Sequence, residues 1–168
     1  KGSKYITSNQ YTVKIEGAGL IGYRALSIAG ARDPIFIGNV QKIILEVKKR
    51  VEDNFQDLID PYFLTFRLYG RDGVMGAMEP LKNYACHELG IVIEAVSKSQ
   101  EIANTICSFA RSTMMHYGYP KRIATAGNLA FPFSPSDLEA GKVYKFLIHH
   151  LVEVDDPMEL FKIRIAQI

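Results

Sequence analysis

A chain of 168 residues with 48% hydrophobic and 23% charged side chains has the composition of one ordinary globular domain, which excludes a disordered or collagen-like protein. Its 20 lysines and arginines against 18 acidic residues give a net charge of +2, without the basic excess typical of nucleic-acid-binding proteins. No apolar run approaches the roughly 18 residues of a membrane-spanning helix, and two cysteines are too few for a disulfide scaffold, so we expect a reduced, cytoplasmic protein that binds neither nucleic acid nor membrane.

Two short strands are expected near the start of the chain. Val13 and Ile15 alternate with polar neighbours, which predicts a half-buried strand over residues 11–16. Residues 22–31 repeat this alternation with small side chains at every second position, so one face of a second strand is expected to be crowded. The Gly-Ala-Gly sequence of residues 17–19 lies between the two patterns and predicts a turn, and we therefore expect a β-hairpin.

A helix and two further strands are expected next. Asp33 can accept the free N–H groups of a helix start, and the proline after it suits the first helical position, so a helix is predicted from here to about residue 54. The basic residues 48–50 are expected to form a solvated face near its end. Period-2 alternation then predicts strands over residues 62–69 and 88–96.

The second half of the chain predicts one more helix and one more strand. Ser97 and Gln100 fit a capping box at the start of an amphipathic helix that ends at Gly118. Residues 122–137 contain glycine and prolines without a clean period and are expected to form a long ordered loop. The last strand is predicted over residues 143–154, and a short turn or edge strand is expected after it.

The last predicted strand has two unlike faces. One face carries Tyr144, Phe146, Ile148, His150, Val152 and Val154, and the other face includes Lys145, His149 and Glu153. Without the first strand of the chain, the order of elements is β-α-β-β-α-β. We therefore expect one domain over residues 1–168, an α+β sandwich of ferredoxin-like kind with a mainly antiparallel sheet of about five strands and both helices on one face.

The segment of residues 69–80, YGRDGVMGAMEP, is expected to be a contorted loop at the end of a strand. Its notable residues are Gly70, Arg71, Asp72, Gly73, Met75, Gly76 and Met78. Three glycines indicate positive φ angles or a close backbone approach, and the two methionines suit a loop that presses against another domain. Arg71 and Asp72 are candidate catalytic residues, and Gly73 and Gly76 are candidate ligand-binding residues.

Histidines near carboxylates suggest acid–base chemistry, since imidazole titrates near neutral pH. His87 or His149 could act with Glu79 or Asp155, although each could equally be a structural histidine. A zinc site would need Cys86, His87, His149 and His150, but no zinc-ligand spacing is present, and neighbouring residues on a strand point to opposite faces. We therefore expect no metal site, and the reactivity of Cys86 remains an open question.

Two glycine-containing segments could bind an anion or a cofactor. The backbone N–H groups around Gly127 and the side-chain amide of Asn128 could hold an anion, or Asn128 could cap a turn. Gly17, Gly19 and Gly22 match a dinucleotide-binding fingerprint, but a strand pattern follows where a helix is required. We therefore expect no bound cofactor.

The chain resembles the C-terminal part of the acyclic terpene utilisation (AtuA-like) family. The matching segments are YTVKIEGAG (residues 11–19), AGARDP (29–34), YGRDGVMGAMEP (69–80), HELGIVIEAV (87–96), TAGNLAFPF (125–133) and HHLVEVDDPMELF (149–161). The resemblance implies a role in the CoA-linked breakdown of branched terpenoid acids, with no catalytic residue to carry over. It also implies that an N-terminal α/β region is missing, and the absence of an initiating methionine likewise suggests an excised domain.

Two functions are expected from these observations. The first is an accessory domain of a catabolic enzyme, inactive as a fragment, in which Arg71, Asp72 and Asn128 contribute to a site completed by the N-terminal region. The second is a non-catalytic module for oligomerisation or interdomain packing. A homo-oligomer is expected, and the glycine-rich loop is interpreted as one side of an interface.

Overall fold

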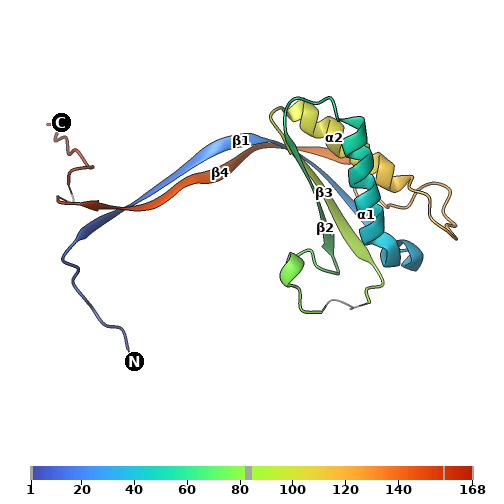
Figure 1. Cartoon of the computed structure of the whole chain (residues 1–168), viewed down its shortest axis with the longest axis horizontal. Helices are drawn as coiled ribbons and strands as arrows, with labels where there is room; N and C mark the ends of the chain where they lie inside the picture. Colours follow the sequence, from blue (N-terminus) through green and yellow to red (C-terminus); the bar gives the residue numbers. More distant parts are fainter. Residues whose placement is uncertain (1, 82–84, 157, 168) are drawn as a thin grey trace. The chain divides into compact units, whose positions relative to one another are not determined.

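The computed structural model describes residues 2–81, 85–156 and 158–167. Its elements are β1 (Tyr11–Ala31), α1 (Pro34–Asn54), β2 (Tyr62–Tyr69), the short 3-10 helix η1 (Gly76–Met78), β3 (Leu89–Ser97), α2 (Gln100–Met115) and β4 (Asp137–Val154), as Figure 1 shows. The strands form an open antiparallel sheet in the order β2-β3-β1-β4. The predicted α+β class is therefore confirmed.

The predicted hairpin around residues 17–19 is wrong, because β1 continues through them as a single strand. The sheet accordingly has four strands instead of about five. The glycines serve close packing against β4: a Cβ on Gly17 would lie 3.5 Å from the Cβ of Ile148, and a Cβ on Gly19 would lie only 2.4 Å from the Cδ1 of Leu147. At Gly17 a Cβ would make an ordinary contact, whereas at Gly19 the Leu147 side chain occupies the space that a Cβ would take.

The start of α1 is confirmed, since the Oδ1 of Asp33 accepts a hydrogen bond of 2.8 Å from the backbone N–H of Ile35. The predicted capping box of α2 is wrong. Ser99 caps this helix by accepting from the N–H of Ile102 at 3.2 Å, while Ser97 is buried at the end of β3. The side-chain amide of Gln100 instead donates to the carbonyl of Arg24 at 2.8 Å and so attaches α2 to β1.

The chain divides into two compact units. Unit 1 comprises Lys1–Leu20 and Tyr144–Ile168, and unit 2 comprises Ile21–Val143. The strands β1 and β4 run through both units, so each unit contains part of these two strands.

The core of unit 2 lies between the sheet and its two helices. The sheet contributes Ala25, Ala31, Leu68, Leu89, Ile91, Ile93 and Ala95, and the helices contribute Phe36, Val40, Ile43, Val47, Ile106, Cys107, Ala110 and Met114. Ala25 pairs with Ala95 and Leu68 pairs with Ile91, so these residues share one face of the sheet. Because one cluster includes this face and both helices, α1 and α2 cover the same face.

The opposite face of unit 2 carries an ion-pair network. Glu94 in β3 is buried, and its two carboxylate oxygens lie 2.5 Å from the Nε of Arg24 and 2.5 Å from the Nη1 of Arg67. The N–H of Arg24 Nε is not aligned with the carboxylate, so this contact is an ion pair without a hydrogen bond. The network joins the three strands β1, β2 and β3.

Candidate functional site

The glycine-rich loop after β2 is a tight turn held by its own backbone. The carbonyl of Leu68 accepts hydrogen bonds from the N–H groups of Arg71, Asp72 and Gly73 at 3.1, 3.2 and 2.9 Å. Gly70 has a φ of +101°, and a Cβ on Gly73 would lie 2.9 Å from the carbonyl carbon of Leu68. The predicted need for glycine in this loop is therefore confirmed at both positions.

A cavity of about 490 Å³ lies between this loop, α1 and β2. Its lining includes Gln41 and Lys48 from α1, Thr65 from β2, and residues 72–77 of the loop. It brings together three of the predicted residues, Asp72, Gly73 and Gly76, but Arg71 is not part of the lining. A lysine and a carboxylate in one small cavity could hold a polar ligand.

Sequence reasoning missed Lys48, which was assigned to a solvated face. Its Nζ lies 6.0 Å from the centre of the Phe66 ring, over β2. The spacing Gln41, Ile44, Lys48 on α1 could have indicated a common helix face, because residues three and four apart are neighbours. Which part of the chain this face meets depends on the tertiary structure.

The predicted acid–base candidates are dispersed. Glu79 accepts a hydrogen bond from the backbone N–H of Leu81 at 2.9 Å and so closes its own turn. The imidazole of His87 is largely exposed, and its Nε2 lies 4.0 Å from a carboxylate oxygen of the adjacent Glu88. In unit 1, the Nε2 of His149 lies 3.4 Å from the Oε1 of Glu16. These exposed pairs lack the burial that shapes an acid–base site.

Asn128 has a structural role at the end of α2. Its Nδ2 donates to the carbonyls of Met114 at 3.0 Å and Tyr117 at 2.8 Å, and its backbone N–H donates to the carbonyl of Met115 at 2.8 Å. Gly127 has a φ of +144°, and a Cβ there would lie 2.8 Å from the Cγ of Met115. The amide that was a candidate anion ligand is therefore occupied by helix carbonyls, which agrees with the alternative of a capping residue.

The cysteines do not form a disulfide in the part of the chain that the structure describes. Cys107 is fully buried in the core of unit 2, and this burial, reinforced by the nearby charge of Asp137, raises the pKa of its thiol to about 12. Such a thiol stays protonated and unreactive at neutral pH. Cys86 is half-buried, and no three His, Cys, Asp or Glu side chains among the described residues come together as a metal site.

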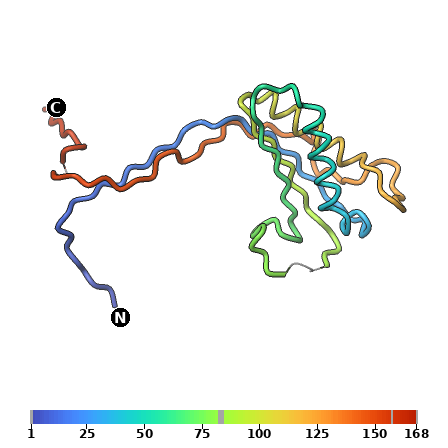
Figure 2. Tube along the Cα trace, viewed as in Figure 1, coloured from blue at the N-terminus to red at the C-terminus, as the bar shows by residue number. Residues whose placement is uncertain are grey.

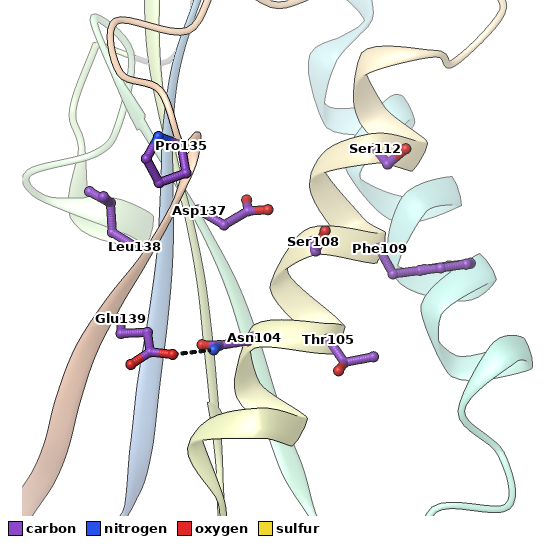
Figure 3. A pocket seen from close by; sticks show the side chains of 9 residues that line it. All are labelled: Asn104, Thr105, Ser108, Phe109, Ser112, Pro135, Asp137, Leu138 and Glu139. Carbon is purple, nitrogen blue, oxygen red and sulfur yellow. Dashed lines mark hydrogen bonds between the residues drawn. The ribbon is translucent and has the colours of Figure 1, made fainter.

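A larger groove of about 860 Å³ separates α2 from the first residues of β4 (Figure 3). Hydroxyl groups of Thr105, Ser108 and Ser112 line the helix side. Both carboxylates on the strand side already have partners: Asp137 forms a two-point contact with Arg111 at 2.7 and 2.9 Å, and Glu139 accepts from Asn104 at 2.8 Å. These contacts hold α2 and β4 together across the groove. Neither Asp137 nor Glu139 is left without a partner.

The most unusual surface belongs to unit 1, where the first half of β1 (residues 11–20) pairs with the second half of β4 (residues 144–154), as Figure 2 shows. We call this two-stranded segment the ribbon. Contacts on one of its faces are polar: Lys14 lies 2.6 Å from Glu16, and Gln10 donates to Glu153 at 3.3 Å.

The other face of the ribbon is apolar, as the alternation in residues 143–154 predicted. Alternation outward from the Gly17–Ile148 contact places Tyr11, Val13, Ile15, Ile148, Val152 and Val154 on it together with His150. We call this set the apolar ribbon face. Tyr11, Ile15 and Ile148 are 58%, 36% and 51% exposed, so side chains of core type lie in solvent.

Comparison with known proteins assigns no family. No family model matches the chain, and no curated protein or solved structure matches it significantly. Among the described residues, no helix is long and apolar enough to cross a membrane.

Proposed function

We propose that this chain is an oligomerisation domain whose ribbon packs against a second copy of the same chain. The single observation that supports this function is the exposed apolar ribbon face. A two-stranded ribbon is marginally stable alone in water and needs a further layer to bury its apolar side.

The apolar ribbon face offers large side chains to such an interface, since Tyr11 and Ile148 on it are 58% and 51% exposed. A second copy is favoured because an uncharged apolar face is complementary to itself, as a two-fold interface requires.

The charges on the opposite face favour a protein partner over an anionic membrane. Lys14 is balanced there by Glu16, and Glu153 adds a second carboxylate. A surface that binds anionic lipid is instead rich in lysine and arginine. The apolar face itself has no charged residue with which to contact lipid headgroups.

Sedimentation velocity of the 168-residue chain at pH 8, from about 1 to 500 µM, tests the proposal. We expect a dimer, which Ile148→Lys should weaken on the order of 100-fold because a lysine cannot be buried unpaired in an apolar interface. Leu151→Lys is the matched control, since Leu151 lies on the opposite face and is similarly exposed at 62%. Only monomer at 500 µM, or equal effects of the two lysines, would contradict the proposal.

A second candidate is an accessory domain of a cytoplasmic enzyme in branched-chain or acyclic terpenoid acid breakdown. The AtuA-like resemblance suggests it, and the cavity with Lys48 and Asp72 supports it. A ferredoxin-like fold fits both candidates, because the order β2-β3-β1-β4 joins two β-α-β units. The partner would then be the N-terminal α/β region that the resemblance implies.

Calorimetric titration with isovalerate and with its CoA thioester tests the second candidate. Binding that Lys48→Met removes and Lys49→Met leaves intact would support it. Arg71→Ala and Asp72→Ala are suitable further variants, whereas Asn128 is unsuitable because it closes the end of α2. No heat of binding with either compound would count against this cavity as their site.

A further inference from the structure

We infer that pH controls the association of two ribbons through His150, an inference that rests on the proposed oligomerisation. His150 lies in the middle of the ribbon part of β4. Strand alternation places it on the apolar ribbon face between Ile148 and Val152, and it places the adjacent His149 on the polar face. His149 faces Glu16 at 3.4 Å, which agrees with this assignment. Two neighbouring histidines therefore have opposite surroundings.

The apolar ribbon face offers a charged imidazole no partner. The one other ionisable side chain among its residues is the phenol of Tyr11. At the alternate positions of residues 11–17 and 148–154 that share this face, no acidic residue is present and His150 is the one basic residue. A second copy packed face to face contributes the same side chains, so it adds no carboxylate.

The acidic residues of the ribbon are on its other face or beyond its end. Glu16 and Glu153 are on the polar face, together with Lys14. Asp155 and Asp156 follow the last residue of β4 and are about 16 Å or more along the chain from His150. The described residues of unit 1 form no further helix or strand that could cover the face.

A neutral imidazole can enter an apolar interface, but a protonated one must first lose its proton or keep the ribbons apart. Imidazole in water takes up a proton near pH 6.5. Each dimer contains two copies of His150, so the separated chains take up two protons that the dimer excludes. By linkage, lowering the pH then favours the monomer, and the dissociation constant rises by about 100-fold between pH 7.5 and pH 5.5.

The experiment is sedimentation velocity of the 168-residue chain at pH 8.0, 7.5, 6.5 and 5.5 at constant ionic strength. The wild type is expected to dissociate on acidification, with a dissociation constant about 100-fold higher at pH 5.5 than at pH 7.5. His150→Gln removes the titrating group, so its dimer should respond less than threefold. His149→Gln is the matched control on the opposite face and should respond like the wild type.

Three outcomes are distinguishable. A dimer of the wild type whose dissociation constant is the same at pH 7.5 and 5.5 overturns the role of His150 and leaves oligomerisation intact. The role of His150 is also overturned if His150→Gln still dissociates on acidification while His149→Gln does not. A monomer at every pH contradicts both the inference and the proposed function. If His150→Gln does not dimerise at pH 8, His150→Leu replaces it, and circular dichroism at pH 5.5 verifies that the helices of unit 2 persist.

Discussion

The sheet of unit 2 and the ribbon of unit 1 use the same alternation of apolar and polar residues, but only one of them is covered. In unit 2 the apolar face of the sheet is buried by α1 and α2, and its side chains are almost inaccessible. In the ribbon, Phe146 and its neighbours on β4 are more than half exposed. Alternation therefore identifies a face that must be buried, while the surface that buries it can be a helix of the same chain or another molecule.

The largest difference is expected from a matched pair of phenylalanines. Phe36→Ala should lower the free energy of unfolding of unit 2 by about 3–5 kcal/mol, because Phe36 is fully buried and its removal leaves a cavity. Phe146→Ala should change the unfolding of unit 2 by less than about 0.5 kcal/mol, since its side chain is exposed. Urea unfolding followed by circular dichroism of the helices measures both. Equal losses would show that the ribbon belongs to the same cooperative core.

Ion pairs provide a second contrast. Glu94→Ala should cost unit 2 about 1–3 kcal/mol, since it leaves Arg24 and Arg67 without their shared carboxylate, and the partial exposure of both arginines reduces the loss. Glu16→Ala in the ribbon removes contacts to Lys14 and His149 that are exposed, and it should cost less than about 0.5 kcal/mol. The unfolding measurement should be repeated at low and high salt. The free energy lost in Glu94→Ala should depend less on salt than the free energy lost in Glu16→Ala.

The helix cap at Asp33 should make unit 2 sensitive to acid. The hydrogen bond from the Tyr119 hydroxyl, and next the N–H of Ile35, hold the pKa of the Asp33 carboxyl below its ordinary value. A lowered pKa contributes stability that is complete above about pH 4 and is lost as the pH falls through the lower folded value. Asp33→Ala should therefore cost about 1–2 kcal/mol at pH 7.

The pH dependence of the stability lost in Asp33→Ala shows whether the loss comes from the capping carboxylate or from the packing of the side chain. The difference between wild type and Asp33→Ala should shrink between pH 5 and pH 2, and urea midpoints across this range measure it. Tyr119→Phe should reproduce part of this pH dependence, because it removes the hydroxyl that donates to Asp33 and keeps the aromatic contact with Phe36. A constant difference across the range would argue against the carboxylate as its cause.

The smallest expected effect concerns a glycine in α1. Gly38→Ala should stabilise unit 2 by about 0.5–1 kcal/mol, because a Cβ there meets no atom within 4 Å and alanine favours the helix. In the ribbon, Gly19→Ala would force the Leu147 side chain away. Thermal unfolding should show a raised midpoint for the first variant and an unchanged helix transition for the second.

Local chemistry in the sequence was sufficient for most of the secondary structure. The cap at Asp33, the strands β2 and β3, and the alternation along β4 follow from short-range rules, and all are present. The start of α2 was assigned to the wrong serine, because Ser97 and Ser99 are both able to cap a helix. The turn at residues 17–19 was wrong because glycine serves both sharp turns and close packing, and the neighbouring strand that distinguishes them is far away in the sequence.

The α+β class, the glycine-shaped loop and the apolar side of the last strand follow from the amino-acid sequence alone. Which parts of the chain meet these features depends on the tertiary structure. It placed Lys48 of α1 beside the loop at Asp72, it directed the amide of Asn128 to the end of α2, and it left the apolar ribbon face uncovered. The physical reason is that burial depends on contacts between residues distant in the chain, whereas turns, caps and alternation depend on neighbours.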